Sequence, residues 1–263
     1  MAQKDSLALA IVQTDLFWED APANQASLEE QLAGLSHPVD VIVLPEMFTT
    51  GFSMTPEKVA EPVNLSSTRW MQQIASQFDA LVIGSFAARE DNKYYNRLLA
   101  VKPDGSFESY DKRHLFRMGG EHQVYNGGKS RLIVDFRGWK ICPLICYDLR
   151  FPVWSRNSDE TPYDLLIYVA NWPAARAYAW DTLLRARAIE NQAYVAGANR
   201  IGSDANGVAH AGGSLLLDFL GKPLSEAGEH ATVLTGKVTL SELRKYRERF
   251  PAYLDADRFE IEI

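Results

Sequence analysis

Cysteine and histidine are scarce in this chain, which has two cysteines and five histidines among 263 residues. The two cysteines, Cys142 and Cys146, lie four residues apart in an apolar run. In an extended strand this spacing puts their Cα atoms about 13 Å apart, beyond the reach of a disulfide bond. The histidines are scattered, and neither cysteine has further ligands at the spacing of a zinc site. We therefore expect two free thiols and no metal site.

Basic runs and long hydrophobic runs are also missing. The formal net charge is −7, so most of the surface would repel a nucleic-acid backbone. The first apolar stretch, residues 7–12, is far shorter than the roughly 20 residues of a membrane span. It follows Lys4-Asp5-Ser6 without the pattern of a signal-peptide cleavage site. We therefore predict a cytoplasmic protein that has neither a nucleic acid nor a membrane as its partner.

Hydrophobic residues make up 46% of the chain, enough for one large α/β domain that needs no disulfide bonds. No internal repeat, low-complexity tract or linker-like segment marks a boundary, so residues 1–263 are predicted to form a single domain. Short apolar runs of strand length recur at residues 7–13, 39–44, 80–86, 98–101, 132–136, 140–145, 165–169, 194–199, 214–218 and 232–238.

Between several of these runs, the apolar residues have helical periodicity, at residues 24–35, 68–78 and 180–191. Strands that alternate with helices indicate an α/β fold. Two pairs of strands are separated by turns only, at 103–105 and 137–138, which predicts hairpins among them. This combination fits a two-sheet, four-layer αββα sandwich.

One apolar run stops abruptly at Cys146, which is followed by Tyr147, Asp148 and Arg150. A strand that ends in a sharp turn into a helix exposes the turn residue and directs backbone N–H groups toward it. Such a site lowers the pKa of a thiol and stabilises an oxyanion. The alternative is a buried structural cysteine, a common role for this residue type. Only Cys146 stands at the predicted junction, because Cys142 lies inside the strand.

Two other strand-like runs end in a charged residue. Glu46 follows an apolar run and Pro45, which cannot continue a central ladder, so it is expected at the carboxyl end of a strand. Lys112 follows an alternating segment that breaks into a basic and aromatic loop. Taken singly, such charges are usually solvated. The three segments become informative when they are considered together.

Together these segments closely resemble the nitrilase superfamily of carbon–nitrogen hydrolases, whose Glu-Lys-Cys triad maps onto Glu46, Lys112 and Cys146. The resemblance extends from about Leu7 to about Lys237, and it implies the same αββα sandwich. It is closest to the omega-amidases, which hydrolyse the side-chain amide of α-keto acids such as α-ketoglutaramate. The matching segments are Leu44-Pro45-Glu46-Met47-Phe48, Tyr110-Asp111-Lys112-Arg113-His114-Leu115-Phe116, Gly120-Glu121, Cys146-Tyr147-Asp148-Leu149-Arg150-Phe151-Pro152, Ala170-Asn171-Trp172-Pro173 and Arg185-Ala186-Arg187-Ala188-Ile189-Glu190-Asn191.

The resemblance implies a cofactor-free cysteine amidase acting on a small-molecule amide. Cys146 as thiolate attacks the amide carbonyl, and Lys112 with the backbone N–H of Tyr147 stabilises the oxyanion. Glu46 takes the thiol proton, passes it to the departing ammonia and then activates the water that cleaves the thioester. Glu121, the second glutamate of the family, holds Glu46 and Lys112 in place, as a helper or a second acid.

Other roles and activities are open at this point. His114 or His122 could form a papain-like pair with Cys146. Asp148 is expected to cap the following helix or to pair with Arg150 rather than to take part in catalysis. The same triad also serves N-carbamoyl hydrolysis, nitrile hydrolysis and acyl transfer, and a binding module that keeps the pocket without turnover is a further alternative.

A substrate with a carboxylate distal to its amide needs a cation in the pocket. Arg117, Arg150 and Arg176 are the loop arginines near the motifs. We favour Arg176, which lies in the loop after Asn171-Trp172, and expect Arg150 to be structural because it lies within the turn itself. Tyr147 is predicted to contact the substrate through its backbone. The candidate apolar walls of the pocket are Phe48, Met118, Trp172 and Trp180.

The tail, residues 240–263, begins with a basic helix-like stretch and then becomes aromatic and acidic through Phe250, Tyr253, Phe259 and Glu262. Exposed aromatic residues at a chain end usually dock against something. Its own domain and a partner subunit are both candidates. Members of the superfamily usually pair their sandwiches, so the resemblance implies a homodimer with this tail at the subunit interface.

Overall fold

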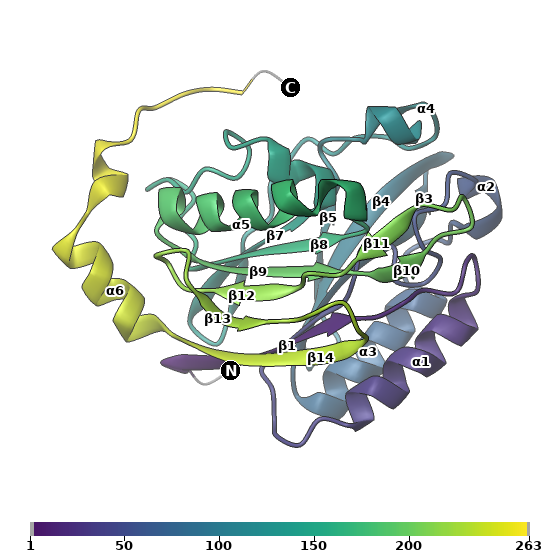
Figure 1. Ribbon diagram of the computed structural model, residues 1–263, viewed down its shortest axis with the longest axis horizontal. Helices are drawn as coiled ribbons and strands as arrows, with labels where there is room; N and C mark the ends of the chain where they lie inside the picture. Colours follow the sequence, from purple (N-terminus) through teal and green to yellow (C-terminus); the bar gives the residue numbers. More distant parts are fainter. Residues whose placement is uncertain (1–2, 262–263) are drawn as a thin grey trace.

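The computed structural model describes residues 3–261 and contains two six-stranded sheets (Figure 1). The first has the order β14-β1-β2-β3-β4-β5 and the second the order β13-β12-β9-β8-β7-β6. The strands of the first sheet are β1 Ser6–Gln13, β2 Val41–Val43, β3 Leu81–Glu90, β4 Lys93–Val101, β5 Phe107–Asp111 and β14 Thr232–Thr239. Those of the second are β6 Val134–Phe136, β7 Trp139–Ile145, β8 Leu165–Ala170, β9 Tyr194–Asn199, β12 Leu215–Leu217 and β13 Pro223–Glu226.

Helices cover the outer face of each sheet, and two short strands form a separate hairpin. The α-helices are α1 Ala21–Ala33, α2 Pro56–Val59, α3 Ser66–Phe78, α4 Glu121–Val124, α5 Ala177–Asn191 and α6 Leu240–Arg249. The 3₁₀ helices are η1 Arg117–Gly119, η2 Cys146–Arg150, η3 Ala174–Arg176 and η4 Ala252–Asp255. The hairpin consists of β10 Ile201–Ser203 and β11 Ala209–Ala211.

Alternation along β1 shows how the layers are built, because successive side chains of a strand point to opposite faces. Leu9 and Ile11 belong to a core cluster that includes residues of the second sheet, whereas Ala10 and Val12 belong to a cluster with α1 and α3. Helix α5 packs on the far side of the second sheet through residues such as Leu184. Figure 1 shows α1 and α3 together on one side of the sheets and α5 on the other. The expected four-layer αββα sandwich is confirmed.

The central strands are continuous apolar runs because they are buried on both faces, as parallel strands usually are. Strand β2 is parallel to both β1 and β3, and β7 is parallel to β8, which is parallel to β9. Parallel strands end at the same edge of a sheet. The segments that follow β2, β7 and β8 carry Glu46, Cys146 and Asn171, and the two sheets bring these segments together.

Each expected strand and helix is present, and the two predicted hairpin turns join β4 to β5 and β6 to β7. Strands β10, β11 and β13 were not predicted. They are three or four residues long and partly exposed, with sequences such as Ile-Gly-Ser and Pro-Leu-Ser-Glu that lack an apolar run. No helix within residues 3–261 is long and apolar enough to cross a bilayer.

The tail forms α6 and η4 and lies against its own chain at several points. The ring of Tyr246 stacks on that of Phe219 at 4.7 Å, and Gln192 Nε2 donates to the Phe250 carbonyl at 2.7 Å. The side chains of Phe250 and Leu254 nevertheless remain more than half exposed. The tail therefore docks partly on its own domain, while the last two residues, including Glu262, lie outside the described part of the chain.

Candidate active site

Cys146 opens η2 directly after β7 ends at Ile145. Its backbone has φ of 43°, in the left-handed region that non-glycine residues rarely adopt. This sharp turn presents the side chain to a cavity of about 620 Å³. Cys142 lies inside β7 and is fully buried, and burial raises the pKa of its thiol to about 12. Of the two thiols, only Cys146 reaches the cavity.

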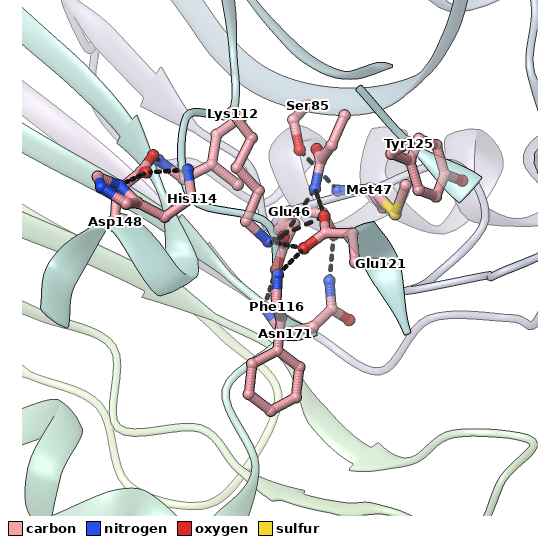
Figure 2. A network of polar contacts seen from close by, with 12 residues as sticks. Glu46, Met47, Ser85, Lys112, His114, Phe116, Glu121, Tyr125, Asp148 and Asn171 are labelled. Atoms are coloured by element: carbon pink, nitrogen blue, oxygen red, sulfur yellow. Dashed lines mark hydrogen bonds and ion pairs between the residues drawn. The ribbon is translucent and has the colours of Figure 1, made fainter. Parts of the chain in front are cut away.

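Glu46, Lys112 and Glu121 form a fully buried cluster of charges (Figure 2). The Nζ atom of Lys112 lies 2.8 Å from Glu46 Oε1, 3.0 Å from Glu121 Oε1 and 2.9 Å from Glu121 Oε2. Lys112 follows β5 and lines the cavity together with Cys146. The structure thus brings together all four residues that were predicted as the catalytic group.

Three further donors hold the two carboxylates, and the sequence analysis did not assign them to the site. Asn96, a buried residue of β4, donates Nδ2 to Glu46 Oε1 at 2.8 Å and to Glu121 Oε1 at 3.1 Å. The backbone N–H of Asn171 donates to Glu46 Oε2 at 2.8 Å, and that of Phe116 donates to Glu121 Oε2 at 2.6 Å. Asn96 had one available signal, because an amide inside a buried strand needs polar partners.

Burial and the neighbouring charges determine the protonation states of the cluster. Burial alone would lower the pKa of Lys112, but the charges of Glu121 and Glu46 outweigh it and raise this pKa above its usual value. Burial raises the pKa of Glu121, against the opposing charge of Lys112. Lys112 is therefore a permanent ammonium ion at neutral pH.

The pKa of the Cys146 thiol is raised well above its usual value, first by burial and then by the charge of Glu46. The expectation of a lowered thiol pKa was therefore wrong. The charge of Lys112 acts in the expected direction, but it is shared with Glu46 and Glu121, so its effect on the sulfur is too small to prevail. A protonated thiol needs a nearby base before it can attack.

Asp148 joins the turn at Cys146 to the segment that carries Lys112. It is fully buried and accepts hydrogen bonds from the Tyr110 hydroxyl at 2.7 Å and from the Ile145 N–H at 3.1 Å. The bond from Ile145 caps the start of η2, as expected. The alternative pairing with Arg150 does not form, because the oxygens of Asp148 accept from Tyr110, His114 and Ile145.

The two candidate histidines lie outside the cavity that Cys146 lines. His114 bonds to Asp148 through its N–H at 3.0 Å and its Nδ1 at 2.8 Å (Figure 2). Its ring stacks on that of Phe151, with 3.7 Å between the ring centres. The Nδ1 atom of His122 is buried without a partner. A papain-like pair with Cys146 therefore has no support in this geometry.

The cavity has aromatic and thioether walls with two arginines among them. Arg176 places its guanidinium 5.7 Å from the centre of the Phe116 ring, and Arg150 lies 5.0 Å from that of Trp172. Both arginines line the cavity and Arg117 does not. Arg150, which was expected to be structural, thus lines the cavity and also stacks on a wall residue, so its role stays a prediction. The other large apolar or aromatic lining residues are Trp18, Phe52, Met54, Met118, Tyr147 and Val208.

Two of the expected walls lie in the core instead. Phe48 is fully buried, with its ring 5.4 Å from that of Trp70 and its Cδ1 close against Gly84. It packs in the layer of α1 and α3, so assigning it to the pocket was wrong. Trp180 is buried behind Trp172, at 5.5 Å between ring centres.

Four ionisable residues at the cavity were not predicted: Glu19, Lys58, Asp204 and His210. They come from a loop, from the short helix α2 and from the β10–β11 hairpin, where the sequence has no recognisable motif. The two hydroxyls of Ser53 and Thr55 lower the pKa of Glu19. Within residues 3–261, no group of three or more His, Cys, Asp or Glu residues is arranged to hold a metal ion.

Comparison with known proteins agrees with this geometry. Residues 8–248 match the model of the carbon-nitrogen hydrolase family. The chain is 49% identical over 257 residues to the omega-amidase YafV of Escherichia coli, covering 97% of this chain and 98% of that protein. It is 32% identical over 250 residues to the 2-oxoglutaramate amidase of Bacillus subtilis, covering 94% and 96%. The crystal structure of a CN-hydrolase superfamily protein from Xanthomonas campestris, with an arsenic adduct in its active site, has a TM-score of 0.96 and 44% identity, covering 98% of this chain and all of that one.

Proposed function

The chain belongs to the carbon–nitrogen hydrolase family, in the omega-amidase branch of the nitrilase superfamily, and we propose that its substrates are small dicarboxylate monoamides. It is a hydrolase that acts on the carbon–nitrogen bonds of linear amides. The proposed substrates are α-ketoglutaramate and succinamate, which would be cleaved to the acid and ammonia. One observation carries this choice: the cavity that holds Cys146 is also lined by two arginines, Arg150 and Arg176.

The proposed reaction begins with a protonated thiol. Glu46 takes the proton as the sulfur of Cys146 bonds to the amide carbon, and the carbonyl electron pair moves onto the oxygen. Lys112 and the backbone N–H of Tyr147 stabilise this oxyanion. When the carbonyl re-forms, the carbon–nitrogen bond breaks, and Glu46 returns the proton to the leaving ammonia. Water, activated by Glu46, then cleaves the thioester and restores the thiol.

Lys112 is suited to the oxyanion because it remains charged throughout. Its raised pKa excludes it as the proton donor to ammonia at neutral pH. The ammonium has three N–H donors, and its recorded partners are the carboxylates of Glu46 and Glu121. Preorganised charge in a buried site costs no reorganisation at the moment of reaction, which is why this arrangement favours the transition state.

A cation in the cavity favours the binding of a substrate that carries a carboxylate distal to its amide. A charge-assisted pair contributes about 1.5–3 kcal/mol, which corresponds to a roughly 10- to 150-fold preference for the anionic substrate over its neutral analogue. We assign this contact to Arg176, with Arg150 as the second candidate, since both line the cavity. Trp172 and Tyr147, which also line it, would pack against the carbon chain of the substrate.

The test is ammonia release from a panel of amides, N-carbamoyl compounds and nitriles. We expect rapid hydrolysis of α-ketoglutaramate or succinamate and a loss of one to two decades in kcat/KM when the distal carboxylate is esterified. Arg176→Ala should remove most of this difference, while Arg117→Ala is the control because Arg117 does not line the cavity. Equal rates on free and esterified substrates would refute the proposed contact between an arginine and the distal carboxylate. Faster turnover of nitriles or N-carbamoyl compounds would show that these, and not monoamides, are the substrate class. Ligand binding without turnover would indicate a binding module.

We also propose that the protein acts in the cytoplasm as a homodimer. Support for the dimer comes from the tail, where Phe250, Leu254 and Phe259 are each at least 49% exposed. A stable dimer buries apolar surface of this kind.

A further inference from the structure

Asn96 contacts both carboxylates of the cluster but does not line the cavity. It is fully buried in β4, and its single Nδ2 atom donates to Oε1 of Glu46 and to Oε1 of Glu121. The same two oxygens also accept from Lys112 Nζ. Two nitrogens, one charged and one neutral, are thus shared by the same pair of oxygens.

The contacts of their carboxylate oxygens distinguish the two glutamates. A carboxylate has about four lone-pair sites, two on each oxygen. On Glu121, Oε1 accepts from Lys112 and Asn96, and Oε2 accepts from the Phe116 N–H and lies 2.9 Å from the Lys112 ammonium as an ion pair. Glu46 fills Oε1 in the same way, but its Oε2 accepts only from the Asn171 N–H. One site therefore remains open on Oε2 of Glu46.

We propose that Asn96 is a positioning residue that directs the thiol proton to Oε2 of Glu46 by donating to its Oε1. With Oε1 filled, the open site on Oε2 is where a proton binds without displacing a hydrogen bond. Glu121, which has the Lys112 ammonium within 3.0 Å of both of its oxygens, remains the counter-ion of Lys112. This inference rests on the proposed function, in which Glu46 is the base that accepts the proton of Cys146.

The orientation of the Asn96 amide is determined by charge. The reverse orientation would place its carbonyl oxygen against two carboxylate oxygens, which repel it. In the observed orientation Oδ1 is buried and has no hydrogen-bond partner. An unsatisfied buried acceptor is unfavourable for folding. The amide therefore donates to the two carboxylates although its own oxygen is left without a hydrogen bond. Such an arrangement is expected of a residue whose position is functional.

Removing this donor should change the acidity of the base, because a hydrogen bond to a carboxylate favours its charged form. The titratable groups that face Glu46 are Lys112, Glu121 and Cys146, and its neutral partners are Asn96 and Asn171. In Asn96→Ala the charged neighbours stay and one donor is lost. The acidic limb of the pH profile of kcat/KM should therefore move to higher pH by about 1–2 pH units.

The experiment compares wild type, Asn96→Ala and Asn96→Asp on one ω-amide across pH. Asp has the shape of Asn but adds a negative charge and supplies no donor when ionised, so its shift should exceed that of Ala. We expect kcat to fall about 10- to 100-fold in Asn96→Ala, with KM within about threefold of wild type, since Asn96 does not line the cavity. Asn157→Ala is the matched control, because Asn157 is also buried and hydrogen-bonded but lines a different pocket. It should lose stability without a change in the pH profile.

A second readout needs no substrate. The rate at which iodoacetamide alkylates Cys146 should follow the ionisation of Glu46, so its pH profile should shift with that of kcat/KM. If both profiles of Asn96→Ala coincide with wild type while stability falls as in Asn157→Ala, Asn96 is only structural and the inference is wrong. If wild type hydrolyses no ω-amide, the proposed function fails, and the alkylation profiles still decide the role of Asn96.

Discussion

Lys112→Met removes the cation from a site that it shares with two carboxylates, while it preserves most of the volume of the side chain. The side chains of Lys112, Glu46 and Glu121 are all 0% exposed, and the nitrogen lies within 3.0 Å of both glutamates. Without it, two negative charges face each other away from water. Breaking a buried ion pair by removing one partner typically costs about 3–5 kcal/mol. For a chain of this length, the loss corresponds to a decrease of about 6–20 °C in Tm.

The loss of stability in Lys112→Met should depend on pH, and the direction of this dependence follows from the carboxyl group of Glu121. In wild type the raised pKa of Lys112 means that its contribution is complete below its unfolded-state pKa, about 10.4. It is therefore constant between pH 5 and 8. In Lys112→Met the Glu121 carboxylate loses its cation, and its pKa, already raised by burial, should rise further above the unfolded value of about 4.3. A raised carboxyl pKa destabilises the protein at high pH, and the penalty decreases as pH falls. The free energy of unfolding of the variant should therefore decrease more, relative to wild type, at pH 8 than at pH 5.

Urea unfolding followed by tryptophan fluorescence at pH 5 and pH 8 measures this difference, since the chain has six tryptophans. Lys140→Met is the control, because Lys140 pairs with Asp135 at 3.2 Å with side chains 45% and 75% exposed. It should change stability by about 0–1 kcal/mol. Adding Glu121→Gln to Lys112→Met should recover part of the loss. A loss below about 1 kcal/mol at pH 8, or an equal loss at both pH values, would refute the electrostatic reasoning.

Two further predictions concern the thiols and the tail. Iodoacetamide should label Cys146 before Cys142, which is fully buried; Cys146→Ala should abolish turnover, and Cys142→Ala should retain activity at some packing cost. Full activity of Cys146→Ala would end the proposed mechanism. Sedimentation should give the dimer mass, and Phe250→Ser with Leu254→Ser should shift the equilibrium toward monomer; a dilute wild-type sample at the monomer mass would contradict the proposed homodimer.

The sequence predicts the fold and three of the four charged or nucleophilic residues, Glu46, Lys112 and Cys146, because their signals are local. Strands β2 and β7 are apolar runs that end abruptly, and Glu46 and Cys146 follow those ends. Lys112 follows the alternating strand β5. The resemblance to the nitrilase superfamily adds Glu121, for which composition and periodicity have no signal.

Residues placed by long-range contacts could not be predicted in the same way. Asn96 contacts both glutamates of the cluster, yet it lies 50 residues after Glu46 and 25 residues before Glu121. Phe48 stands two residues after Glu46, yet its ring turns into the layer of α1 and α3. Residues 46–50 form a turn after β2 rather than a continuation of the strand, so proximity to a motif does not place a side chain in the cavity.

The protonation state of Cys146 depends on the same long-range contacts. A local argument from the turn predicts a lowered thiol pKa, because the start of a helix and a nearby lysine both favour a thiolate. In the folded chain, however, Lys112 is bound to two carboxylates, and Glu46 adds its own negative charge near the sulfur. The raised pKa therefore favours the protonated thiol at neutral pH. A nucleophile held in this state requires its base within the same buried cluster, which is the position that Glu46 occupies.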